Sequence, residues 1–146
     1  MRVLVQRVSS AGVTVDGDTV GSIGSGLVLL VGVGTEDDSA AVDYCAEKSA
    51  NLRLFADDDG RMNRSLVDVS GAALVISQFT LYGDCTRGRR PSFNAAAGAA
   101  VAHRLYDEFG DTLARRGLEV ARGVFGAHMC VEIHNDGPVT VLVEYP

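Results

Sequence analysis

The first third of the chain alternates apolar and polar residues with a period of two. Residues 2–15 follow this pattern, which is typical of a half-buried strand because successive side chains of a strand point to opposite faces. The Asp-Gly pair at 16–17 is a strong signal for a hairpin turn, so residues 19–23 are predicted to return antiparallel. A second turn at 24–26 leads into residues 27–33, which are apolar on both faces. We therefore predict a meander of three strands.

Two later segments have the pattern of helices. Thr35 precedes three acidic residues, as at the capped start of a helix, and apolar residues recur on one face as far as Ala50. The second predicted helix is rich in alanine and runs from about Phe93 to Arg116. Gly117 is suited to end it.

Strands are predicted between and after these helices. Short strand-like pieces at 51–55 and 61–69 flank an acidic turn, and residues 72–79 form a buried central strand. Alternation resumes over residues 118–145, interrupted by a predicted Asn-Asp-Gly-Pro turn at 135–138. The sum is an α+β fold in which largely antiparallel sheets form a barrel-like core covered by two helices.

The composition does not alter the predicted fold, but it excludes some classes of function. Residues 1–146 are 47% hydrophobic and 22% charged, so we expect a single domain around one core. A net charge of −6 argues against broad binding to a nucleic-acid backbone, although a small pocket for an RNA end stays open. Cys45, Cys85 and Cys130 lack a CxxC spacing and are predicted to be reduced thiols. No run has the length of a membrane span or signal-peptide core, so we expect a cytoplasmic protein without membrane contact.

Four residues on one face of the last predicted strand resemble a metal site superficially. They are His128, Cys130, Glu132 and His134. Alternate residues of a strand lie about 6.6–7 Å apart, so a row of four is unable to wrap a tetrahedral ion. A solvated strand face is favoured, and we expect neither a metal nor another cofactor.

Polar side chains end the buried central strand, where Ser77, Gln78 and Thr80 follow an apolar run. The chain contains no GxSxG elbow of the kind that presents a serine nucleophile. A triad of Ser77 with His103 or His134 is compatible with the sequence, but no spacing requires it.

Two further features leave alternatives open. Arg87, Arg89 and Arg90 form the one local basic cluster, within the predicted loop 83–91, and a solvated loop and a phosphate contact fit it equally well. Pro138 follows Gly137 in the predicted turn. Because only about 5–6% of X-Pro bonds are cis in folded proteins, the residues alone favour an ordinary turn.

Several motifs occur together in the order of a known family. They are Val5-Gln-Arg-Val8, Ser77-Gln-Phe-Thr-Leu-Tyr-Gly-Asp84, Arg90-Pro-Ser-Phe93, Gly123-Val-Phe-Gly126 and Asn135-Asp-Gly-Pro-Val-Thr140. Together they closely resemble the D-aminoacyl-tRNA deacylases, also called D-tyrosyl-tRNA deacylases, nearly end to end. The combination of SQFTLYGD with a terminal NxGPVT is highly specific.

The resemblance implies a cytoplasmic homodimer that hydrolyses the ester joining a D-amino acid to the 3′-terminal adenosine of tRNA. It also implies removal of glycine from wrongly charged tRNA. In that family a cis Gly137–Pro138 unit would reach into the pocket of the partner subunit as a chirality filter. Its two carbonyl oxygens would exclude an L side chain, which is specificity by repulsion of the wrong enantiomer. Arg7 would hold this loop in place.

The resemblance also suggests roles for the polar stretch that ends the central strand. Thr80 has been considered a nucleophile assisted by Gln78, but threonine is weak without an adjacent base. We favour an RNA-assisted reaction, in which backbone N–H groups near Phe79 and Thr80 bind the oxyanion and the adenosine 2′-OH helps to activate water. Ser77 and Gln78 would then shape the pocket.

The terminal adenine would lie between Phe125 and Met129, through stacking and sulfur contact. Gripping only the acceptor end would also account for the acidic net charge. His128 and Cys130 depart from the acidic and the polar or basic residues expected there, and residues 85–87 replace a more lysine-rich loop. These departures leave the contacts of the pocket rim with tRNA open.

Two other classes of function remain at this point. The first is an esterase or amidase acting on small D-amino-acid derivatives, with Ser77 or Thr80 as the nucleophile. The second is a non-catalytic protein that binds RNA ends. An esterase or amidase of the first class would cleave substrates that lack adenosine, whereas a D-aminoacyl-tRNA deacylase would require adenosine. A binding protein of the second class would release no amino acid from D-aminoacyl-tRNA.

Overall fold

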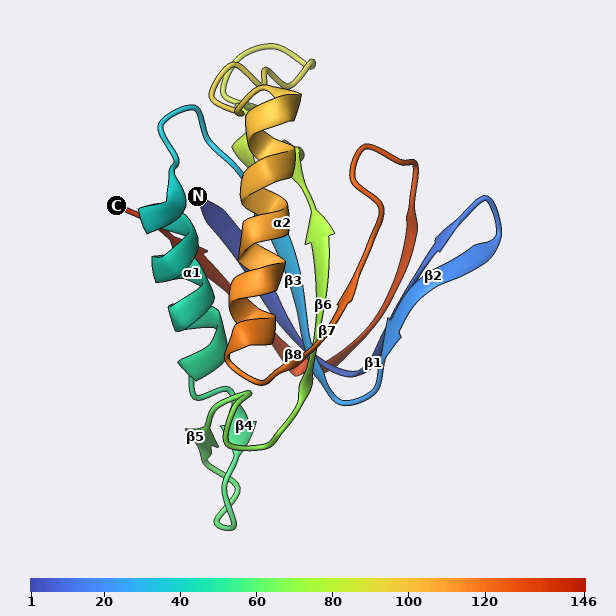
Figure 1. Ribbon diagram of the computed structural model, residues 1–146, viewed down its shortest axis with the longest axis vertical. Coiled ribbons are helices and arrows are strands. Elements are labelled where there is room, and N and C mark those ends of the chain that lie inside the picture. The colour runs from blue at the N-terminus through green and yellow to red at the C-terminus, as the bar shows by residue number, and fades with distance from the viewer.

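The computed structural model describes residues 1–146, and Figure 1 shows a curved sheet with two helices on one face. Six strands form the main sheet: β1 (Arg2–Val15), β2 (Asp18–Ile23), β3 (Gly26–Gly32), β6 (Ala72–Ser77), β7 (Glu119–Arg122) and β8 (Cys130–Glu144). The helices are α1 (Ser39–Asn51) and α2 (Ala99–Arg115), with a short 3-10 helix, η1 (Phe79–Tyr82). A separate ribbon consists of β4 (Phe55–Ala56) and β5 (Met62–Arg64).

Strand β1 organises the sheet because it pairs along both of its edges. Residues 2–8 of β1 pair with β3, and residues 11–15 pair with β2, all antiparallel. Strand β8 pairs antiparallel with β1 from Arg2 to Thr14. Strands β2 and β3 therefore follow one another along one edge of β1, and β8 occupies the other edge. The predicted meander is wrong in this respect, since β3 does not pair with β2.

The sheet is mixed and almost closes on itself. Strands β3 and β6 pair in parallel, as do β6 and β7, so the antiparallel part of the prediction holds only around β1. Strand β2 approaches β7 closely enough that a Cβ at Gly21 would lie 2.7 Å from the carbonyl oxygen of Arg122. The α+β, barrel-like prediction with two covering helices is confirmed, with the correction that parallel pairs form one side.

The core has two parts, one on each face of the sheet. Both helices pack against the sheet and against each other (Figure 1), and Leu105, Phe109 and Leu113 of α2 are fully buried there. A smaller cluster, which includes Val13 and Leu74, fills the inside of the curved sheet. Burial of each such side chain contributes about 1.5–3 kcal/mol, so the helices fix the sheet on which the site is built.

Helix α1 begins later than predicted because other contacts hold Asp37, the second of the three acidic residues. Asp38, and not Thr35, is the N-cap, and its side chain accepts the N–H groups of Ala40 at 2.9 Å and Ala41 at 3.2 Å. Asp37 is turned away: its carboxylate pairs with the amino group of Met1 and accepts the N–H of Gly34. A long-range contact has therefore moved the start of the helix.

Helix α2 begins at Ala99, well after the predicted start at Phe93. The intervening segment is tied to the end of β3, because Ala97 donates to the carbonyl of Val33 at 2.9 Å and Thr35 donates to that of Ala95 at 3.2 Å. These backbone groups are therefore unavailable for a helical turn.

The strand predicted over 61–69 stops at Arg64. Ser65 and Asp68 bond each other reciprocally: the Ser65 N–H donates to Asp68 Oδ2 at 2.8 Å, and the Asp68 N–H donates to Ser65 Oγ at 3.1 Å. This local turn ends the strand. The piece predicted at 51–55 is also mostly non-strand, because only Phe55–Ala56 pairs with β5.

The last third contains β7, an excursion over 123–129, and then β8. The predicted alternation is confirmed in β8 on either side of residues 136–138: odd-numbered residues at 131–135 and 139–143 are more buried than their even-numbered neighbours. Residues 123–129, predicted to continue this strand, are not a strand. The predicted turn at 135–138 is instead a bulge in one continuous strand. Gln6 pairs with Thr140 and Val8 with Asn135, so β8 advances five residues while β1 advances two.

Candidate active site

A hollow of about 460 Å³ lies among the ends of β3 and β6, the start of α2 and the excursion 123–129. Its lining is mostly apolar, and the polar side chains are those of Ser77 and Gln78, from the junction of β6 with η1, and of His128, from the excursion. It unites five predicted residues from two distant parts of the sequence: Ser77, Gln78, Phe79, Phe125 and Met129. We refer to it below as the active-site pocket. Its size is within the usual range of ligand pockets, about 300–1,000 Å³.

The polar end of this pocket is the junction of β6 with η1. The N–H of Gln78 donates to the carbonyl of Val31 at 2.8 Å, which holds the junction against β3. The side-chain amide of Gln78 donates to the hydroxyl oxygen of Thr80. Thr80 itself is exposed and does not line the pocket. Phe79 and Thr80 stand in the first turn of η1, and the first N–H groups of a helix lack partners within it.

The two histidines considered for a triad lie elsewhere. His103 stacks flat on Phe125, with ring centroids 4.4 Å apart and an interplanar angle of 6°, and its Nε2 lies 3.5 Å from Asp107. His134 lines a different hollow, on the outer side of β1 and β2. Neither histidine forms a hydrogen bond with Ser77, so the structure does not assemble this triad.

Packing from behind fixes the apolar wall of the pocket. Phe125 packs against His103 and Tyr106 of α2, whose ring centroids are 4.4 and 5.9 Å away. Met129 occupies space left by Gly123, where a Cβ would lie 2.6 Å from Met129 Sδ. Sequence reasoning missed the roles of His103 and Gly123. Gly123, the first glycine of the GVFG motif, was the available signal for a close approach of Met129.

The bulge of β8 presents Gly137 and Pro138 at the surface, away from the active-site pocket of the same chain. The peptide bond between them is cis, and Gly137 has a φ of +123°. Arg7 lies beneath the bulge: its Nε donates to the carbonyl of Asp136 at 3.3 Å and its Nη1 to that of Leu54 at 2.5 Å. The loop is thus exposed in front and anchored behind.

Asn135 provides the second anchor of the bulge. Its side-chain amide donates to the carbonyls of Arg7 at 2.9 Å and Val139 at 3.0 Å. The hydroxyl of Thr140 donates to Asn135 Oδ1 at 3.2 Å. One side chain therefore closes the neck of the loop and ties it to β1.

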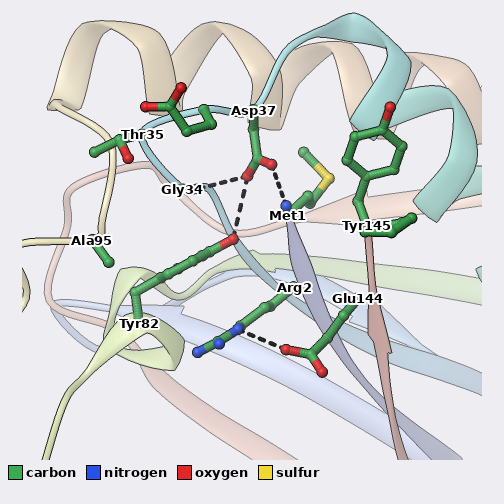
Figure 2. A pocket seen from close by; sticks show the side chains of 11 residues that line it. Met1, Arg2, Gly34, Thr35, Asp37, Tyr82, Ala95, Glu144 and Tyr145 are labelled. Atoms are coloured by element: carbon green, nitrogen blue, oxygen red, sulfur yellow. Dashed lines mark hydrogen bonds and ion pairs between the residues drawn. The ribbon is translucent and has the colours of Figure 1, made fainter.

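A second hollow, of about 340 Å³, is shown in Figure 2. Asp37 lies at its centre, where it pairs with the amino group of Met1 and accepts the Gly34 N–H at 2.6 Å and the Tyr82 hydroxyl at 3.4 Å. Burial, with Asp37 nearby, raises the pKa of Tyr82 to about 12. Arg2 lies over the Tyr82 ring. These contacts fix the end of η1 and leave no free nucleophile or base at the centre.

The row of His128, Cys130, Glu132 and His134 is exposed along one side of the chain. No group of three or more His, Cys, Asp or Glu side chains is arranged to hold a metal ion. No helix is long and apolar enough to cross a membrane.

The family model described as D-Tyr-tRNA(Tyr) deacylase matches residues 4–144. A D-aminoacyl-tRNA deacylase of Fervidobacterium nodosum is 55% identical over 144 residues, covering 99% of this chain and 97% of the relative. The corresponding values for that of Thermomicrobium roseum are 58%, 99% and 94%. The chain belongs to the D-aminoacyl-tRNA deacylase family. The predicted membership is confirmed, and the protein is a hydrolase.

Two solved structures share the fold of this chain. A structure titled c-Myc DNA Unwinding Element Binding Protein has a TM-score of 0.94 and 37% identity, covering 100% of this chain and 99% of its own. A probable eukaryotic D-amino acid tRNA deacylase has a TM-score of 0.85 and covers 99% and 98%. At 18% identity this second likeness supports the fold alone. All five motifs of the sequence fall within or at the bounds of the match to the deacylase family.

Proposed function

We propose that the protein hydrolyses the ester bond of D-aminoacyl-tRNA in the cytoplasm and releases a free D-amino acid and tRNA. Glycine wrongly attached to tRNA is a further substrate. One observation carries the proposal: in a member of this family, the pocket unites the Ser77–Phe79 segment with Phe125 and Met129. A polar reacting end and an apolar, aromatic wall are what an aminoacylated adenosine requires.

The adenine of the substrate lies against the apolar wall. Phe125 offers a ring already held from behind by His103, and Met129 offers a polarisable sulfur close to Gly123. Aromatic side chains stack on any base, and sulfur contacts with aromatic rings are favourable. Adenosine is bound by its ring faces, and the ester then lies at the junction of β6 and η1.

The reaction at this junction does not need a side-chain nucleophile. The hydroxyl of Thr80 accepts a hydrogen bond from Gln78 and has no base beside it, so nothing activates it. Backbone N–H groups of Phe79 and Thr80 stabilise the oxyanion that develops on the ester carbonyl. The adenosine 2′-OH, which neighbours that carbonyl, helps to position and activate water. Ser77 and Gln78 shape the polar end.

Selection between enantiomers comes from a second subunit. Gly137 and Pro138 are exposed, firmly anchored by Arg7 and Asn135, and absent from the pocket of their own chain. In an isologous homodimer each subunit donates such a loop and receives one. The two carbonyl oxygens face the α-carbon and leave no room for an L side chain, while D-residues and glycine are accepted.

The direct test is hydrolysis of D-Tyr-tRNA and L-Tyr-tRNA by the wild type and by Pro138→Ala. We expect the wild type to cleave only the D form, and the variant to lose discrimination. Equal cleavage of both forms by the wild type would refute the filter. Glycyl-tRNA, which has no side chain to exclude, should be cleaved by both proteins.

A small D-amino-acid ester distinguishes the alternative esterase or amidase with Ser77 or Thr80 as nucleophile. We expect D-tyrosine ethyl ester, which lacks adenosine, to be a very poor substrate compared with D-Tyr-adenosine. Efficient cleavage of the ethyl ester, abolished by Ser77→Ala or Thr80→Ala, would favour the esterase.

A further inference from the structure

An aromatic pair stands exposed at the rim of the active-site pocket. Phe79 lines the pocket, yet its side chain is 54% exposed. Its ring packs edge to face on Phe93, with centroids 5.0 Å apart and an interplanar angle of 68°. Large apolar side chains exposed beside a binding pocket commonly mark a contact surface.

The segment between these two rings carries the basic cluster that the proposed reaction does not use. Arg87, Arg89 and Arg90 are exposed, and none of them forms an ion pair or a side-chain hydrogen bond. The loop lies at the N-terminal end of α2 (Figure 1). In a chain of net charge −6, three adjacent uncompensated arginines next to a pocket form a local positive surface.

The ends of this loop are fixed, so the arginines project from a defined place. Asp84 and Ser92 exchange backbone hydrogen bonds of 2.7 and 3.0 Å, which close the base of the loop directly beside Phe93. The Asp84 carboxylate accepts the N–H of Thr86 at 2.9 Å, and this hydrogen bond lowers the Asp84 pKa. The base of the loop thus carries the charge of Asp84, and the tip carries only positive charge.

We propose that Phe79, Phe93 and the arginines of residues 87–90 form a platform for the single-stranded nucleotides that precede the terminal adenosine of tRNA. This inference rests on the proposed function. The penultimate base stacks on the exposed aromatic pair, and the arginines bind the adjoining phosphates. Stacking together with phosphate contact is the usual means of binding single strands without reading sequence. The surface is continuous with the pocket that takes the adenosine.

Substitutions of Phe93 and of the arginines test the platform without changing the residues proposed to act on the ester. We would measure kcat and KM with two substrates, D-Tyr-tRNA and D-Tyr-adenosine, which lacks the preceding nucleotides. Phe93→Ala should raise KM for D-Tyr-tRNA about 5- to 100-fold, given the usual contribution of one stacked base. Its kcat, and both constants for D-Tyr-adenosine, should stay unchanged. Phe93→Tyr keeps the ring and should restore the wild-type KM.

The double variant Arg89→Ala/Arg90→Ala should raise KM for D-Tyr-tRNA only. It should also flatten the dependence of log KM on log salt by about 0.7 for each phosphate that an arginine no longer neutralises. Arg61→Ala is the matched control, because Arg61 is also exposed and unpaired but lies in the β4–β5 ribbon. This control should behave as the wild type.

Three results would overturn the platform. They are an unchanged KM for D-Tyr-tRNA, an equal change for both substrates, and a shift from dimer to monomer in Phe93→Ala, which would assign the aromatic face to a second copy of the chain. Failure of the proposed function is distinguishable, because the wild type would then cleave neither D-Tyr-tRNA nor D-Tyr-adenosine.

Discussion

The junction of β6 with η1 and the bulge of β8 are both rich in polar groups, but the chain treats them in opposite ways. The junction lines a hollow together with other segments of the same chain, notably Phe125 and Met129. The bulge is anchored from behind by Arg7 and Asn135 and meets nothing in front. Groups that line a pocket can act on a ligand that enters it, whereas a loop that is anchored and exposed is available to contact another molecule.

In the proposed function the junction carries the chemistry and the bulge carries the selection between enantiomers, and the chemistry can be tested most strongly. D-Tyr-tRNA ending in 2′-deoxyadenosine should be cleaved about 10²- to 10⁴-fold more slowly, the usual contribution of a positioned proton-transfer group. Thr80→Ala should retain substantial activity, since no base activates its hydroxyl. Single-turnover deacylation measures both. An inactive Thr80→Ala with an active deoxy substrate would restore threonine as the nucleophile.

The assignment of the two regions to different subunits predicts complementation. Pro138→Ala damages only the loop and Met129→Ala only the pocket. When the two proteins are unfolded, mixed and refolded together, half the dimers are mixed and each has one intact site. About a quarter of the wild-type D-selective activity should therefore return in an isologous dimer. If the D-selective activity of the refolded mixture were no greater than the mean of the two separate variants, the loop and the pocket of each site would belong to one chain.

The anchoring of the bulge predicts a smaller loss of selectivity. Arg7→Ala removes the bonds to the carbonyls of Leu54 and Asp136, so the loop should loosen and the ratio of D- to L-Tyr-tRNA cleavage should fall about tenfold, which is about 1.4 kcal/mol of discrimination. Arg64, which pairs with Asp58 on the surface, offers Arg64→Ala as the control. A ratio that stays at the wild-type value in Arg7→Ala would remove Arg7 from the filter.

On the pocket side, a single methyl group should have a measurable effect. Gly123→Ala places a carbon 2.6 Å from Met129 Sδ and 3.0 Å from Ile76. Overpacking of this kind costs about 1–3 kcal/mol, and KM for D-Tyr-adenosine should rise as Met129 is displaced. Gly24→Ala, where a Cβ meets no atom within 4 Å, is the control. Denaturant unfolding and steady-state kinetics measure the two effects.

The smallest predicted effect concerns alkaline stability. Burial raises the pKa of Tyr82 to about 12, whereas an unfolded tyrosine ionises near pH 10. The unfolded state therefore releases its proton first, and the unfolding free energy falls as the pH rises from about 10 to 12. Tyr82→Phe should show a shallower fall in this window. Tyr44→Phe, which alters an exposed ring, should follow the wild type.

The sequence predicted those parts of the molecule that local periodicity governs. The period of two correctly indicated which residues of β8 are more buried at 131–135 and 139–143, and the apolar run 72–76 correctly indicated a buried strand. The order of the motifs identified the family, which the periodicity of apolar residues alone could not identify. The pocket residues Phe125 and Met129 came from that resemblance.

The errors share a cause, namely contacts between residues distant in sequence. Thr35 and Asp38 are both good helix caps, and the choice was made by Asp37, which is held by Met1 and Gly34. The Asn-Asp-Gly-Pro segment has the composition of a turn, and only pairing with β1 on both sides makes it a bulge. Neither the contacts of Asp37 nor the pairing of β8 with β1 can be inferred from local residue preferences.

The bulge of β8 has a consequence for how this protein can diverge. Before it Val131 and Ile133 pack on the inner cluster, and after it Val139 and Val141 pack on the helix side. The extra residues lie outside both sets of contacts. Mutation can therefore lengthen, shorten or reshape the tip while the flanking parts of β8 keep their packing, so the tip can diverge with little penalty to folding.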